Sequence, residues 1–178
     1  IISQFRDVSK AVASVGDEAR RAGVNVEAFQ EWKFVAEQNR IGVDALTDGL
    51  KELNLRADEF VQTGKGSAAE AFMRLGYGTD ELARKLQNPS ELLLEIIGRL
   101  GSFERAAQIR ISDELFGGSA GERFVELLDQ GEQGIRDTIE EAHRLGAVMD
   151  QELIEKAAEL DRRFNAITTA VGTGLKTA

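Results

Sequence analysis

Residues 88–101 read NPSELLLEIIGRLG, and this stretch holds the start, the apolar face and the end of one helix. Asn88 can cap the helix, Pro89 suits its first position, and Glu91 completes a capping box. The most apolar surface in the chain follows, formed by Leu92, Leu93, Ile96, Ile97 and Leu100. Gly101 then ends the helix. Because this face is broad, we expect it to lie in an internal core.

Apolar stripes of helical period, separated by glycines, continue on the N-terminal side. We expect helices over residues 2–22, about 26–40 and about 45–63. Asn25 and Asp44 can cap the second and third of these helices, and Gly42 can separate them. Since the spacing of apolar residues by three and four persists across Gly42, one long bent helix is the alternative. We favour two helices.

Shorter helices are expected after a flexible joint at Gly64-Lys65-Gly66. Their predicted ranges are 67–75, 79–86, 102–116, about 120–129 and 132–145. Ser67 with Glu70, and Ser119 with Glu122, have the spacing of capping boxes, in which each side chain bonds a backbone N–H at the helix start. Glycines between these segments suit helix C-terminal caps.

A final long helix is expected to begin after its cap at Asp150. Its apolar stripe has a heptad-like spacing and consists of Leu153, Ala157, Leu160, Phe164, Ile167 and Val171. Packing within the chain and self-association into a coiled coil explain this stripe equally well. We therefore name Leu153, Leu160, Phe164, Ile167 and Val171 as a candidate seam for a partner helix.

These elements predict an all-α fold, a multi-helix bundle of short helices with a long C-terminal helix. The chain begins without Met and its last helix has no strong stop signal. We therefore expect residues 1–178 to be a helical segment of a larger protein. The joint at Gly64-Lys65-Gly66 suggests a subdivision into a helical hairpin region, 1–63, and a helical core with the long terminal helix, 67–178.

Composition agrees with a helical protein and excludes several function classes. Among 178 residues there is a single proline, Pro89, and no cysteine, so disulfides and thiolate metal sites are excluded. The net charge of −9, without a Lys/Arg stripe, argues against direct binding to nucleic acid. No apolar run approaches the roughly 20 residues of a membrane span.

No residues in the sequence suggest catalytic, cofactor-binding or metal-binding chemistry. The only histidine, His143, has one nearby acid on its helix face, Glu140, whereas zinc needs three or four ligands. Gly64-Lys65-Gly66-Ser67 lacks the first half of a phosphate-binding loop and follows a helix. No pair of the many carboxylates is marked out by an apolar setting. We therefore expect no enzyme activity and no cofactor.

Four segments together resemble the phage tail tape-measure protein family, which includes phage and prophage minor tail proteins. They are FQEWKFVAEQNRIGV at 29–43, GSAAEAFMRLG at 66–76, ELFGGSAG at 114–121 followed by Leu127-Leu128, and AHRLG at 142–146 followed by a helix containing Phe164-Asn165. Each segment alone is short. Their order and spacing carry the resemblance, which covers about residues 23–170.

The resemblance implies a structural protein of the virion tail, made in the cytoplasm of a bacterial host. Such proteins set tail length during assembly, leave the tail at DNA ejection, and contact tail-tube and tail-tip proteins. The repeated glycines depart from an uninterrupted rod, so we expect a compact portion beside the ruler. The alternatives are a helical adaptor or interaction module unrelated to phage and, third, a fragment of a cell-wall hydrolase.

Overall fold

The computed structural model describes residues 2–174, except for the side chains of residues 2, 3, 5 and 170–174. Every regular element in this range is a helix, which confirms the all-α bundle of short helices with a long last helix. The elements are α1 (Ile2–Ala22), α2 (Val26–Gln38), α3 (Val43–Thr63), α4 (Ala69–Arg74), α5 (Thr79–Lys85), α6 (Pro89–Leu100), α7 (Arg105–Phe116), α8 (Gly118–Phe124), the 3-10 helix η1 (Val125–Asp129), α9 (Gly131–Arg144) and α10 (Gln151–Gly174).

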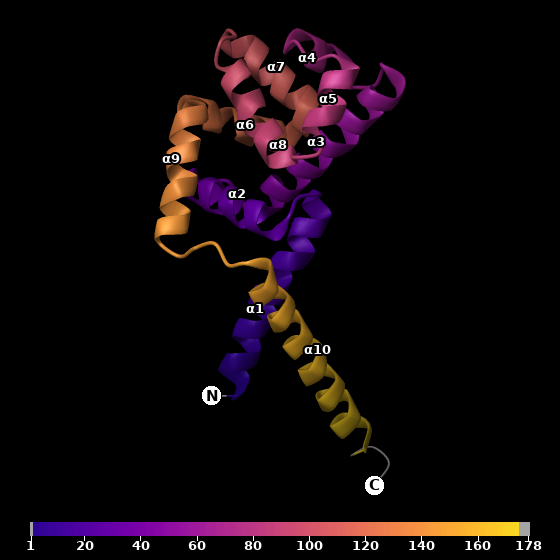
Figure 1. Ribbon diagram of the computed structural model, residues 1–178, viewed down its shortest axis with the longest axis vertical. Helices are drawn as coiled ribbons and strands as arrows, with labels where there is room; N and C mark the ends of the chain where they lie inside the picture. The colour runs from indigo at the N-terminus through magenta and orange to yellow at the C-terminus, as the bar shows by residue number, and fades with distance from the viewer. Residues whose placement is uncertain (1, 175–178) are drawn as a thin grey trace.

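The helices form a head and a stalk (Figure 1). The head consists of α2–α9. The stalk consists of α1 and α10, which run in opposite directions, cross each other and project away from the head. Ala19 and Ala22, near the end of α1, are buried where the stalk joins the head.

One contiguous core runs through the head and draws on residues from both parts of the suggested subdivision. The apolar face of α6 lies in this core as expected, because Leu92, Leu93, Ile96, Ile97 and Leu100 are all buried. Trp32 of α2 is fully buried, and its indole Nε1 donates a hydrogen bond of 2.8 Å to the Ser90 hydroxyl at the start of α6. The division at 63–67 stays a prediction.

Three predicted caps are confirmed. The side chains of Asn25, Asn88 and Asp150 accept hydrogen bonds from the backbone N–H groups three residues later, at 2.8, 3.2 and 2.8 Å. The prediction of two helices around Gly42 is also confirmed. Asp44, however, lies in the first turn of α3, because Gly42 itself occupies the cap position.

The predicted capping boxes are wrong. The cap positions of α4 and α8 are Ala68 and Gly117, and neither helix start has a side-chain cap. Gly117 has φ +78°, which glycine adopts easily, so α8 begins before Ser119. The Glu91 carboxylate pairs with Arg136 instead of closing a box at Asn88.

Two predicted ranges also change. The segment expected to be helical from Ser102 becomes helical only at Arg105, with Glu104 at the cap position. The segment expected at about 120–129 divides into α8 and the 3-10 helix η1.

Two glycines allow α8 to pack closely. A Cβ at Gly121 would lie 2.8 Å from the Ser112 carbonyl oxygen of α7, and a Cβ at Gly49 of α3 would lie 2.4 Å from the Phe124 ring. Phe124 in turn stacks on Phe116, with 4.6 Å between the ring centroids. Helix α8 is therefore held between α3 and α7 at distances that only glycine permits.

Candidate functional site

The candidate seam of α10 does not pack within the chain as one unit. Leu153, Leu160 and Ile167 are 50%, 39% and 62% exposed. Phe164 is half-buried, and the side chain of Val171 lies outside the described residues. The structure therefore places three of the five seam residues together on a solvent-facing side of the stalk.

A neighbouring face of α10 packs on α1 instead. Ile154 is 3% exposed, and its Cγ2 lies 3.4 Å from the position of a Cβ at Gly16. Ala158, one turn later, is half-buried and lines the same groove. Near the far end of the stalk, Arg6 donates a hydrogen bond of 2.9 Å to Asn165. Gly16 thus lets the two helices approach, and Ile154 is a large buried side chain that anchors α10.

A buried glutamine fastens the segment between α9 and α10 to the head. The carboxamide nitrogen of Gln30 donates to the Met149 carbonyl at 2.8 Å, and its oxygen accepts from the Met149 N–H at 2.9 Å. Gln30 is only 5% exposed and comes from α2, 119 residues away in the sequence. One side chain therefore satisfies both backbone groups of Met149.

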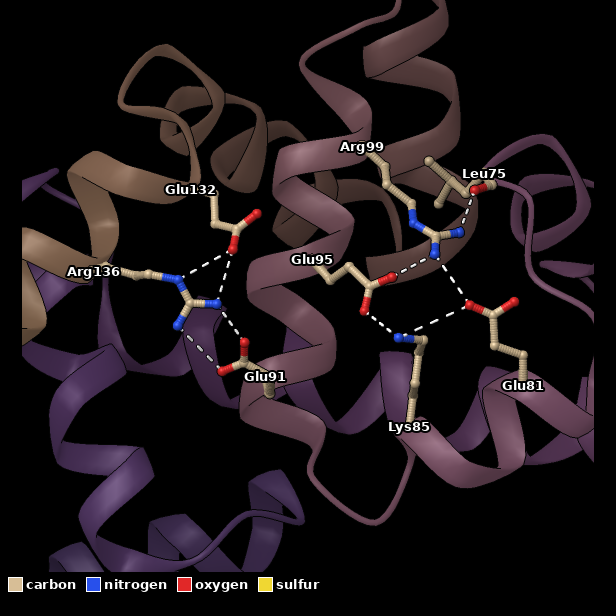
Figure 2. Close-up of polar contacts among 8 residues, drawn as sticks. All are labelled: Leu75, Glu81, Lys85, Glu91, Glu95, Arg99, Glu132 and Arg136. Atoms are coloured by element: carbon tan, nitrogen blue, oxygen red, sulfur yellow. Dashed lines mark hydrogen bonds and ion pairs between the residues drawn. The ribbon is translucent and has the colours of Figure 1, made fainter.

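Two charged clusters flank α6 and fasten it to its neighbours (Figure 2). In the first, the Arg99 guanidinium contacts Glu95 at 2.5 Å, Glu81 at 3.1 Å and the Leu75 carbonyl at 2.7 Å. It also lies 3.9 Å from the centroid of the Tyr77 ring. Because Leu75 and Tyr77 come from the turn between α4 and α5, and Glu81 comes from α5, the cluster fixes that part of the head against α6.

The second cluster joins α6 to α9. Arg136 bonds Glu132 on its own helix at 2.8 Å and Glu91 at the start of α6. The spacing of Glu95 with Arg99, and of Glu132 with Arg136, could have indicated the pairs within each helix. The contacts between helices have no such signal in the sequence. Both clusters hold helices together, and Glu91 and Arg136 of the second cluster also line a surface cavity.

The Lys85 ammonium and the Arg99 guanidinium shift the acidity of Glu95. Partial burial by itself would raise the pKa of Glu95, but the hydrogen bond from Lys85 and the two positive charges outweigh it and lower that pKa below its usual range. The ionised carboxylate is therefore favoured in the folded chain. Its contribution to stability is present above about pH 4.5, near the unfolded pKa, and is lost as the pH falls through the lower folded value.

Glu95→Gln is expected to lower the free energy of unfolding by about 1 kcal/mol at pH 7, because it removes the charge that Lys85 and Arg99 contact. The difference from the parent chain should shrink below about pH 4. Urea denaturation at several pH values measures both effects. Glu140→Gln, at an exposed position of α9, is the control and should change stability by less than about 0.5 kcal/mol. Equal effects of the two substitutions would contradict this assignment.

The surface cavities among the described residues include two that lie between helices. One, of about 510 Å³, lies between α1 and α10 and is lined by apolar residues with charges of both signs at Asp17, Arg20, Asp161 and Arg162. The other, of about 340 Å³, lies among α2, α6 and α9, and its charged lining residues are four acids, Glu27, Glu31, Glu91 and Glu140, and one base, Arg136. The mixed charges of the first cavity select no single class of ligand.

His143 of α9 has a partner on a neighbouring helix. Its Nε2 lies 2.7 Å from the Glu31 carboxylate of α2, and the side chain is half exposed. Within the described residues, no three side chains of the metal-binding types converge on one point. In the same part of the chain, no helix combines the length and apolar character of a membrane span. Among the features of the described residues, the exposed apolar seam of α10 is the strongest candidate for a functional surface.

Comparison with known proteins finds no matching family model, no matching curated protein and no matching solved structure.

Proposed function

We propose that this chain is a structural component of a phage tail, as its resemblance to tape-measure proteins implies. In this role it takes part in tail assembly, in setting tail length and in DNA ejection, and it acts through contacts between helices without catalysing a reaction. Its place is the virion tail, after assembly in the cytoplasm of the bacterial host.

The exposed seam of α10 is the observation that carries this proposal. Leu153, Leu160 and Ile167 recur every seven residues along a helix that projects from the head. Apolar side chains in such a row favour burial against another helix. Glu152, Lys156, Glu159 and Arg163 pair with each other along the helix beside the seam, so its border combines both signs of charge. The proposed partners are further copies of the chain, and tail-tube and tail-tip proteins.

A ruler function makes a quantitative prediction about tail length. An α-helix rises about 1.5 Å per residue, so 178 residues span no more than about 270 Å when fully helical and extended. An in-frame deletion of this segment from its phage gene should shorten the tails by up to that length, measured by electron microscopy. Tails of unchanged length would refute length determination by this segment. If the chain is instead an adaptor unrelated to phage, its deletion should change neither the length nor the assembly of tails.

Leu160→Asp combined with Ile167→Asp is expected to abolish self-association of the chain. Both side chains are exposed in the single chain, so its own melting temperature should change little, whereas a charge buried between copies is strongly unfavourable. Sedimentation equilibrium measures the association. Leu55→Asp is a matched control, because Leu55 is a 56% exposed leucine of α3 in the head. The seam is not the partner face if the seam variant and the control associate equally.

A further inference from the structure

We propose that α9 and α10 form a conformational switch, in which the bent segment 145–150 becomes helical and joins them into one continuous helix over 131–174. In the described state α10 is docked on α1, and in the second state it is released from α1 and extends directly from α9. This inference goes beyond the proposed function and does not depend on the chain being a tail component.

The apolar pattern runs through the bend without interruption. At intervals of three or four residues the sequence has Ile135, Ile139, Ala142, Gly146, Met149, Leu153, Ala157, Leu160, Phe164 and Ile167. This is the pattern of a single helix with one apolar seam. Its one irregularity, two successive intervals of four around Leu153, is the kind of insertion that coiled coils accommodate by local unwinding. If only the bent state mattered, the apolar residues of α9 and α10 would not need to follow one continuous helical spacing.

In the docked state, the shared seam is buried on α9 but mostly exposed on α10. On α9, Ile135 and Ala142 are fully buried in the head. On α10, Leu153, Leu160 and Ile167 remain exposed, because α10 is rotated so that Ile154 faces α1. Ile154 lies about 100° around the helix from Leu153. Docking therefore leaves Leu153, Leu160 and Ile167 largely exposed, and only the continuous helix would bring them into line with Ile135 and Ala142.

Gln30, Asp150 and Gly146 hold the bend, and they do so through hydrogen bonds that replace those of the continuous helix. In that helix the Met149 N–H would bond the Leu145 carbonyl, and the Met149 carbonyl would accept from the Leu153 N–H. In the docked state Gln30 occupies both backbone groups of Met149, and the Asp150 carboxylate takes the Leu153 N–H. The two backbone groups of Met149 and the Leu153 N–H thus have a partner in both states, whereas the buried Gln30 carboxamide gives up both of its bonds to Met149 in the continuous helix.

Gly146 is the third group. It has φ +70°, and beyond it the Ala147 N–H bonds back to the Ala142 carbonyl at 2.9 Å, which ends α9 in a Schellman motif. Nothing lies within 4 Å of a Cβ at this position. The other residues of the bend, Leu145, Ala147, Val148 and Met149, are compatible with a helix, and no proline is present. The glycine is thus the main local obstacle to a continuous helix of about 66 Å.

Gly146→Ala tests the switch without disturbing any packing. Alanine disfavours the positive φ of the bend and favours a helix over glycine, so the equilibrium should shift by roughly 30-fold or more toward the continuous helix. Adding Gln30→Ala and Asp150→Ala removes the other two groups. In this triple variant we expect the Cα chemical shifts of residues 145–150 to become helical in NMR spectra.

Crosslinking measures release of α10 in the same variants. The chain has no cysteine, so Arg6→Cys with Asn165→Cys gives a unique pair at a place where α1 and α10 touch. A short thiol crosslinker should join the pair efficiently in the docked parent and poorly in the triple variant. Once the pair is crosslinked, the bend should stay non-helical even with Gly146→Ala.

Gly64→Ala and Gln108→Ala are matched controls. Gly64 also ends a helix with φ +66° and has open space around it, and Gln108 also donates its carboxamide to a backbone carbonyl. Neither should change the bend. The switch is refuted if α10 is released while residues 145–150 stay non-helical, if they become helical with α10 still docked, or if nothing changes in the triple variant and in Gly146→Ala alone.

Discussion

Trp32→Ala is expected to lower the free energy of unfolding by about 4 kcal/mol, one of the two largest effects that the structure predicts. Trp32 is completely buried in the middle of the head and connects α2 to α6 through its bond to Ser90. Truncation removes its packing and leaves a cavity that the surrounding helices cannot fill. Against a total stability of roughly 5–15 kcal/mol, a loss of this size removes from about a quarter to most of the free energy of unfolding.

Trp32→Phe separates packing from hydrogen bonding. Phenylalanine keeps an aromatic ring in the core but cannot donate to Ser90, so a smaller loss of about 2 kcal/mol is expected. Urea denaturation followed by circular dichroism measures both variants, since the only tryptophan is removed in each. Equal losses for alanine and phenylalanine would contradict the packing argument, and so would a loss below about 1 kcal/mol for Trp32→Ala.

Local signals in the sequence predicted much of the fold. The face of α6 and the caps at Asn25, Asn88 and Asp150 were predictable because each depends on residues within one helical turn. The capping boxes predicted at Ser67 and Ser119 were wrong, because spacing within one turn does not decide which residue occupies the cap position. A neighbouring alanine or glycine can take the cap position in place of the serine, as Ala68 and Gly117 do here, and tertiary packing decides which residue occupies it.

The surface of α10 was only half predictable. A heptad-like stripe identifies an apolar seam, but it does not identify which face of the helix an unrelated helix will cover. Ile154, outside the stripe, became the anchor because Gly16 of α1 leaves room for it. The contact between Gln30 and Met149 joins residues 119 apart and has no local pattern at all. Contacts of this kind follow from the packing of whole helices and not from spacing along one of them.

Gly121→Ala is expected to destabilise the head by about 3 kcal/mol, although alanine is the better helix former by about 1 kcal/mol. A Cβ at Gly121 would lie 2.8 Å from both the Ser112 carbonyl oxygen and the Asp113 Cα, and 2.9 Å from the Asp113 nitrogen. These are backbone atoms of α7, so no side chain can rotate away to make room. Helix α7 would have to move as a unit, and its buried residues Ile111 and Leu115 fix it in the core.

Gly98→Ala is the matched control for that substitution. Gly98 also lies inside a helix, α6, but the nearest atom to its added Cβ is the carboxylate end of Glu132, at 2.6 Å. A flexible side chain can withdraw, and the gain in helix propensity then offsets the loss of its contact, so a change within about 1 kcal/mol is expected. Thermal and urea denaturation compare the two variants. A Gly121→Ala chain as stable as Gly98→Ala would mean that α7 and α8 do not approach at backbone distance. The clamping of α8 between α3 and α7 would then have to be abandoned.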